Sequence, residues 1–252
     1  MKLKSSYKSF DEILRAHIDK NTKEREKFTD NQWWWASDLG LCQRKQFFRR
    51  LELKATESKE YGIQFLGRDG TALHEWRQKA AKEMDCVVES EYNLKDKKLR
   101  YKGRFDILVK LKSGLSLIDI KSQRSEAFWR RKKLPLKNKI QRFQKLQLAS
   151  YVYFAKRKWP ELEEARLYFV DRGSGVREEY IFHFNKKIFD AVLTELKELN
   201  DHWTKEKFPD INKDWLCRYC PYRSICKEVD KEKLTVKQTT KKYAYKNKSM
   251  EK

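Results

Sequence analysis

Long apolar segments are missing from this chain of 252 residues. No run approaches the 18 or so apolar residues that a membrane-spanning helix needs, and the basic start at Met1–Lys4 leads into polar sequence without a signal-peptide pattern. The phosphate-binding pattern Gly-x4-Gly-Lys-Ser/Thr is missing too, so a nucleotide-driven motor would have to come from a partner. We therefore expect a cytoplasmic protein without a membrane partner.

Acidic residues are scarce relative to basic ones. The chain has 59 Lys and Arg against 37 Asp and Glu, which gives a net charge of +22. A surplus of this size indicates a polyanionic partner, and nucleic acid fits better than a membrane surface. The length allows one large domain with a sizeable core.

The five cysteines are an odd number, and three of them fall within ten residues. In a chain without a secretory signal this pattern indicates a metal site rather than a disulfide framework. Cys217, Cys220 and Cys226 supply three thiolates, and the fourth ligand must be Cys42 or Cys86. Cys86 opens an apolar Cys-Val-Val stretch and is more typical of a buried small side chain. Spacing alone leaves zinc and an iron–sulfur cluster open, with a slight preference for zinc.

A β-hairpin is predicted over residues 104–121. Lys112–Gly114 is the only turn signal between two strand-forming runs, and a tight turn there places Asp106 opposite Asp119 or Lys121. Either register leaves these three side chains on one face of the hairpin. The other face is predicted to be an apolar surface that packs on a helix. Its members are Phe105, Ile107, Val109, Ile118 and Ile120.

Two carboxylates this close repel each other unless a cation lies between them. A divalent ion with oxygen ligands, Mg²⁺ or Mn²⁺, fits this position. Lys121 would then face a scissile phosphate or the attacking water, where its charge opposes the negative charge of a transition state. The alternative is a solvated surface pair, which is the usual explanation of Asp-x-Lys alone.

The remaining elements are predicted from periodicity and capping residues. Helices are expected at 38–51 with Ser37 as N-cap, at 64–84, at 136–158, and at 186–205 with Asn185 as N-cap; strands are expected at 86–92, 98–111, 115–121, 162–171 and 176–184. His74 would lie on the second helix, either as a structural residue or as a third metal ligand. Gln147 and Tyr151 share one face of the third helix.

Residues 121–145 carry ten Lys or Arg against a single acid, Glu126. Because this run also holds Phe128 and Trp129, a groove that follows phosphates is favoured over a plain solvated face. The predicted DNA contacts are Arg124, Arg130, Arg131, Lys132 and Lys133. Trp33–Trp35 is interpreted as partly buried core, with base stacking as the alternative. Residues 1–30 form a polar lead, and the Lys-rich segment 227–252 is predicted to be a disordered basic arm.

Taken together, His74, Gly103-Arg-Phe-Asp106, Asp119-Ile-Lys121 and Gln147-x3-Tyr151, bracketed by the cysteines, resemble the PD-(D/E)XK nucleases of the RecB type. More narrowly, the chain resembles their iron–sulfur branch, known from the CRISPR-associated "Cas-four" exonucleases and AddB-type helicase–nuclease subunits. The resemblance spans about residues 36–227. It departs from many relatives in having Asp119 where they have Glu.

This resemblance implies a mixed α/β fold, with a central β-sheet flanked by helices as in restriction endonucleases and a cysteine-cluster subdomain joining both ends of residues 31–226. It implies a [4Fe–4S] cluster on Cys42, Cys217, Cys220 and Cys226. It also implies a dication held by His74, Asp106, Asp119 and the backbone carbonyl of Ile120. Lys121 would aid the nucleophilic water, while Gln147 and Tyr151 would support the site and the DNA.

The expected activity is metal-dependent hydrolysis of DNA by an exonuclease acting on single strands or on DNA ends. The expected context is CRISPR spacer processing beside an integrase, or viral or repair metabolism in a prokaryotic or infected host cell. A non-catalytic nucleic-acid-binding scaffold and the nuclease subunit of a helicase complex are the alternatives. A homo-oligomer is compatible with either.

Overall fold

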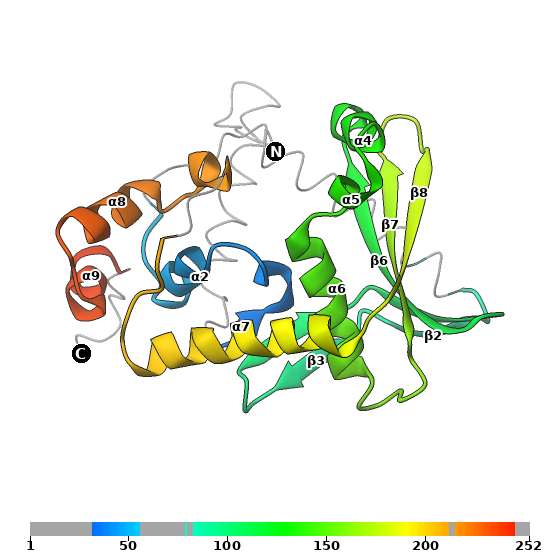
Figure 1. Cartoon of the computed structure of the whole chain (residues 1–252), viewed down its shortest axis with the longest axis horizontal. Helices are drawn as coiled ribbons and strands as arrows, with labels where there is room; N and C mark the ends of the chain where they lie inside the picture. Colours follow the sequence, from blue (N-terminus) through cyan, green and yellow to red (C-terminus); the bar gives the residue numbers. More distant parts are fainter. Residues whose placement is uncertain (1–31, 56–78, 80–82, 212–214, 245–252) are drawn as a thin grey trace, which may run out of the picture.

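The computed structural model describes residues 32–55, 79, 83–211 and 215–244, which form a mixed α/β fold (Figure 1). Its strands are β1 (Trp34–Trp35), β2 (Val87–Ser90), β3 (Asn93–Asp96), β4 (Tyr101–Arg104), β5 (Ile107–Leu111), β6 (Gly114–Gln123), β7 (Glu164–Asp171) and β8 (Arg177–His183). Its helices are η1 (Ala36–Asp38), α2 (Gln43–Arg50), α4 (Ser125–Lys132), α5 (Leu136–Lys139), α6 (Arg142–Ala155), α7 (Lys186–Thr204), η2 (Trp215–Tyr219), α8 (Arg223–Lys231) and α9 (Val236–Tyr243). The predicted fold class is confirmed, although the strands divide between two mixed sheets.

The larger sheet has the strand order β2-β5-β6-β7-β8. β6 and β7 are parallel because α4, α5 and α6 form the crossover between them, while the other pairs are antiparallel. In the β5–β6 hairpin Leu108 pairs with Leu117, one of the two predicted registers, and continuing it places Asp106 opposite Asp119. The turn ends at Gly114, whose φ of +117° favours glycine.

The smaller sheet has the order β1-β4-β3, and the chain leaves it at Arg104 to enter β5. The strand predicted over 98–111 is therefore two strands, and the predicted apolar face is wrong for Phe105. The Phe105 ring packs in the main core against Tyr92 and Trp159, whereas Ile107, Val109 and Ile120 form a second, small cluster. Because the chain changes sheet between Arg104 and Ile107, the Phe105 side chain no longer lies on the same face as Ile107 and Val109.

Helix α6 is the centre of the main core and packs against α7, η1, β3 and β7. Leu108 and Leu117, on the face of the hairpin that carries Asp119, belong to the same core. The helix predicted over 136–158 is divided, because the chain extends at Ile140–Gln141 before α6 begins.

The predicted helix at 38–51 begins later than expected. Residues 36–38 form the short helix η1, and Cys42 is the N-cap residue of α2 rather than a residue inside the predicted helix. Gly40, with a φ of +76°, lies so close to α6 that a Cβ there would be 2.8 Å from the Phe143 Cα. This contact with α6 prevents a single continuous helix.

Among the three adjacent tryptophans, Trp34 is buried and its indole N–H donates a 3.0 Å hydrogen bond to Asn200 Oδ1. The Arg50 guanidinium lies over the rings of both Trp34 and Trp203, at 4.3 and 4.2 Å from their centres. The core interpretation therefore holds for Trp34. Trp33 and Trp35 are half-buried.

The C-terminal segment is helical, so the predicted disordered tail is wrong for residues 227–244. Val229 of α8 and Val236 and Thr239 of α9 are buried, and the Lys54 N–H donates to the Tyr243 carbonyl at 2.8 Å. A few apolar residues at helical spacing are enough to dock both helices. Residues 245–252 lie outside the described residues.

Helix α7 begins as predicted, because the Asn185 side chain accepts a hydrogen bond from the Ile188 N–H. The predicted helix at 64–84, with His74, lies largely outside the described residues. No helix in the described ranges has the length and apolar character to cross a membrane.

Candidate active site

The two aspartates of the hairpin lie on the same, buried side of the larger sheet. Asp106 precedes β5 and is 8% exposed, and Asp119 in β6 is 3% exposed. The Ile120 N–H donates a 2.7 Å hydrogen bond to Asp106 Oδ2, which fixes the first carboxylate against the strand of the second. The structure thus places the two carboxylates on one face of the hairpin, as the tight turn at Lys112–Gly114 predicted.

Lys121 connects this pair to helix α6. Its Nζ lies 2.8 Å from Asp119 Oδ2 and donates a 3.0 Å hydrogen bond to Gln147 Oε1. Gln147 Nε2 in turn donates to the Tyr151 hydroxyl at 2.9 Å. The chain Asp119–Lys121–Gln147–Tyr151 is therefore continuous, and together with Asp106 it brings together five of the predicted site residues.

Two supporting residues were not predicted from the sequence. Ser150 Oγ donates to the Gln147 carbonyl at 2.7 Å and lies 3.0 Å from the Tyr101 hydroxyl. The available signal was periodicity, since Tyr101 alternates with Gly103 on one strand and Ser150 follows Gln147 by three residues on a helix. Gly103 lets these rings approach, because a Cβ there would lie 2.6 Å from the Tyr101 hydroxyl and 2.9 Å from Tyr151 Cε1.

The electrostatics of the site keep Tyr151 neutral. Burial raises the pKa of Tyr151 well above its ordinary value, and the charges of Asp119 and Asp106 raise it further. The phenol therefore retains its proton through neutral and mildly alkaline pH. Both carboxylates raise the pKa of the same hydroxyl, so both lie within electrostatic reach of Tyr151.

The donor set suits a hard divalent cation. Two buried carboxylates and the adjacent backbone carbonyl of Ile120 offer only oxygen, which Mg²⁺ and Mn²⁺ prefer. Within the described ranges no three His, Cys, Asp or Glu side chains are placed to hold one ion. The predicted third protein ligand, His74, lies outside those ranges.

This arrangement of a carboxylate-bearing hairpin and a lysine two residues after the second acid agrees with a comparison of sequence families. Residues 2–227 match the PD-(D/E)XK nuclease superfamily. The chain belongs to that superfamily. A search of curated proteins gives no significant match.

Two solved structures share the fold of this PD-(D/E)XK nuclease. SSO0001 is similar over 85% of this chain and 96% of its own, with 21% identity and a TM-score of 0.53. The alkaline exonuclease LHK-Exo from Laribacter hongkongensis is similar over 73% of this chain and 93% of its own, with 13% identity and a TM-score of 0.51. At these identities the likeness shows the fold.

The basic run beyond Lys121 forms α4 and α5 of the nuclease. Arg124, Arg130, Lys132 and Lys133 are exposed, and Lys132 Nζ lies 4.8 Å from the ring centre of Trp129, which is 40% exposed. Arg131 differs, and its predicted contact with DNA is wrong for this conformation. It is buried, its Nη1 donates to Glu178 at 2.8 Å, and its guanidinium stacks 3.8 Å from the Phe169 ring centre.

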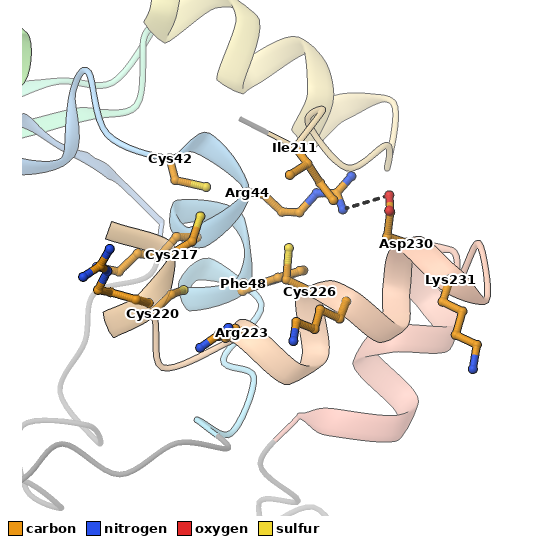
Figure 2. Close-up of a pocket in the computed structure, with 13 residues that line it drawn as sticks. Cys42, Arg44, Phe48, Ile211, Cys217, Cys220, Arg223, Cys226, Asp230 and Lys231 are labelled. Carbon is orange, nitrogen blue, oxygen red and sulfur yellow. Dashed lines mark ion pairs between the residues drawn. The ribbon is translucent and has the colours of Figure 1, made fainter. Parts of the chain in front are cut away.

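The cysteines gather at the other end of the molecule. Four of them, Cys42, Cys217, Cys220 and Cys226, line one pocket of about 580 Å³ and come from the start of α2, from η2 and the turn after it, and from α8 (Figure 2). Cys86 is exposed and not part of this lining, so its interpretation as a buried side chain is wrong. Burial raises the pKa of both Cys220 and Cys226, so these thiols keep their protons at neutral pH until a metal displaces them.

Proposed function

We propose that this superfamily member is a divalent-metal-dependent DNA exonuclease that acts on single-stranded DNA or DNA ends. The observation that carries the proposal is the continuous chain Asp119–Lys121–Gln147–Tyr151, with Asp106 on the same buried face. A solvated surface pair would not be buried, nor linked to a helix 26 residues away. The buried network therefore supports a catalytic role for Asp106, Asp119 and Lys121.

The proposed roles of Lys121, Gln147 and Tyr151 rest on their contacts, and those of His74 and the Ile120 carbonyl rest on the resemblance to RecB-type nucleases. Asp106, Asp119, the Ile120 carbonyl and His74 would hold the dication, which supplies charge neutralisation and a polarised water when it is bound. Lys121 is held by Asp119 and Gln147, so its ammonium is fixed where it opposes the charge that develops on the attacked phosphate. Tyr151 fixes Gln147 in turn, and its raised pKa keeps the hydroxyl protonated while it does so.

The exposed cations of α4 and its flanks provide a path for the DNA backbone. Arg124, Arg130, Lys132 and Lys133 would neutralise phosphates, and Trp129 would stack on a base. These residues follow directly after β6 in the chain, so they continue from the strand that carries Asp119 and Lys121. LHK-Exo, which shares the fold, is an alkaline exonuclease, and we propose the same mode of action here.

The four-cysteine pocket supports membership of the RecB-type iron–sulfur branch. Four thiols line one pocket of about 580 Å³, which is the number of thiolate ligands that a [4Fe–4S] cluster takes, although the described residues do not place any three of them to hold one ion. A structural zinc ion is the alternative with the same four ligands. Iron, sulfide and zinc analysis of anaerobically purified protein separates the two, and iron with visible absorbance is expected.

Several biological settings are compatible with the proposed activity. CRISPR spacer processing beside an integrase, viral or repair DNA metabolism, and service as the nuclease subunit of a helicase complex are each compatible with a cytoplasmic enzyme of this kind. Gel filtration would test a homo-oligomer.

The test is a cleavage assay with end-labelled single- and double-stranded DNA, with and without Mg²⁺ or Mn²⁺. We expect the natural sequence to cleave only with metal and Asp119→Ala to lose all detectable cleavage while it still binds DNA. Full activity of Asp119→Ala would move the active site elsewhere. Tight DNA binding by the natural sequence without any cleavage would identify a scaffold instead.

A further inference from the structure

The four-cysteine pocket is surrounded by positive charge. Apart from the thiols and two apolar residues, its lining consists of six basic side chains and one acid, Asp230. The basic residues are Arg44, Lys45, Arg218, Arg223, Lys227 and Lys231. Their number exceeds what the pocket's single acid can neutralise.

The charges divide into a structural group and an unpaired one. Arg44 is buried, donates from Nε to the Pro209 carbonyl at 2.8 Å, and lies 3.9 Å from Asp230 (Figure 2). Arg44 is therefore anchored in the fold, and Asp230 is its ion-pair partner. Arg223, Lys227 and Lys231 are exposed, and none of them forms an ion pair in the described part of the chain.

The three exposed cations form a stripe along α8. They are spaced at i, i+4 and i+8, so they lie on one face of the helix, while Ile225 and Val229 are buried in the core. At a rise of 1.5 Å per residue the stripe is about 12 Å long. Like charges at this spacing repel one another, so a ligand that bridges them lowers the energy of the helix.

The acids of α8 and its C-cap residue, Glu232, cannot relieve this repulsion, because each has a partner on another element. Glu228 receives hydrogen bonds from Lys242 and Tyr243 of α9, Glu232 lies 3.7 Å from Lys242, and Asp230 faces Arg44. A negatively charged metal–thiolate cluster in the pocket would offset part of the positive charge of Arg223. Lys231 points away from the thiols, so its charge stays in solvent (Figure 2).

An exposed aromatic residue lies on η2, the short helix that contacts α8. Tyr219, between two of the cysteines, is 61% exposed, and the Arg218 guanidinium lies 5.9 Å from its ring centre. An aromatic ring among cations is the combination that binds unpaired bases and their phosphates, since every base has a face on which it can stack. A duplex would leave such a ring without a base to stack on.

We propose that η2 and α8 form a second DNA-contact surface, in which Arg223, Lys227 and Lys231 bind the backbone of a single strand and Tyr219 stacks on one of its bases. This rests on the proposed DNA substrate, and it adds a contact separate from the basic segment of α4. The surface holds the strand at the end of the molecule opposite the larger sheet, as Figure 1 places α8 and β8.

The test is fluorescence anisotropy with a labelled oligothymidylate of about 30 nucleotides, on the full chain carrying Asp119→Asn so that no DNA is cut. The charge variant combines Arg223→Ala, Lys227→Ala and Lys231→Ala. Its matched control, K97A/K98A/K112A, removes three exposed lysines from the β3–β4 and β5–β6 turns. Thermal melting of each variant verifies the fold.

We expect the charge variant to bind at least tenfold more weakly than the control, with a salt dependence reduced by about 2 in log–log slope. Tyr219→Ala should weaken binding about tenfold, and Tyr219→Phe should not. Equal DNA affinities of the charge variant and its control would show that η2 and α8 do not form a DNA-contact surface. The proposed function stands in that case if the natural sequence still cleaves DNA with Mg²⁺ or Mn²⁺, and it fails if the natural sequence does not cleave, whether or not it binds.

Discussion

The carboxylate site and the four-cysteine pocket are assembled in opposite ways. The site takes its described residues from a continuous stretch, Asp106 to Tyr151, and every predicted side chain in it is held by strand pairing or by a hydrogen bond. The pocket joins residue 42 to residues 217–226 across 175 residues, and its thiols are only half-buried. The site is organised by the fold itself, whereas the metal proposed for the pocket would close a long loop and stabilise the fold in that way.

The largest effect in this comparison is expected at Lys121. Lys121→Met should lower kcat roughly 10²- to 10³-fold, because a fixed charge opposite the developing phosphate charge is lost. The fold should survive, since methionine fills the same partly buried space. The measurement is cleavage of end-labelled DNA under saturating metal, together with a thermal melt.

Lys110→Met, on the exposed end of the same hairpin, is the matched control and should leave cleavage unchanged. Activity of Lys121→Met within a factor of five of the control would remove the lysine from the mechanism.

A stability effect is expected at the pocket. Cys217→Ser should abolish metal binding and lower the melting temperature by about 10 °C, because the closure of a long loop is lost. Cys86→Ser is the control, since that thiol is exposed and distant from the pocket lining. Visible absorbance and calorimetry measure the two effects, and residual cleavage at low temperature is expected.

A Cys217→Ser protein that keeps its metal and its melting temperature would show that the pocket needs no bound group. The proposed difference between a site held by the fold and a pocket held by a metal would then be wrong.

The smallest expected effect is on the melting temperature, and it concerns a hydrogen bond between α7 and the segment before α2. Glu195 of α7 is buried, and its carboxylate accepts the Gly40 N–H that precedes α2. Burial raises the pKa of Glu195, so the ionised form is disfavoured in the folded state and stability falls as pH rises through that pKa. Glu195→Gln keeps the acceptor without the charge. It should raise the melting temperature at pH 7 by no more than a few degrees, and by nothing at pH 4.

A pH-independent difference between Glu195→Gln and the natural sequence would show that packing, rather than charge, decides the effect. Asp201→Asn, on the exposed side of α7, is the appropriate comparison.

Much of the carboxylate site was predictable because it depends on local rules. One turn at Lys112–Gly114 fixes the register, and the register fixes which side chains meet. The support from Tyr101 and Ser150 was not predictable, since it depends on how a second sheet docks against α6. The break at Phe105 was hidden by an apolar pattern that fits one long strand as well as two short ones.

The C-terminal helices were missed for the opposite reason. Their surface is so rich in lysine that composition alone predicts disorder, yet Ile225, Val229 and Val236 are enough to dock them. Arg131 shows the same limit, because a run of charges does not reveal which member turns inward to stack on Phe169.

Metal binding by the aspartate pair tests the central claim most directly. Titration of Mn²⁺ into the natural sequence, Asp106→Asn and Asp119→Asn, followed by electron paramagnetic resonance, measures the ion without any reliance on cleavage. Each substitution is expected to weaken Mn²⁺ binding at least tenfold, because the two carboxylates supply the negative charge of one site. Unchanged Mn²⁺ affinity in both variants would contradict the account.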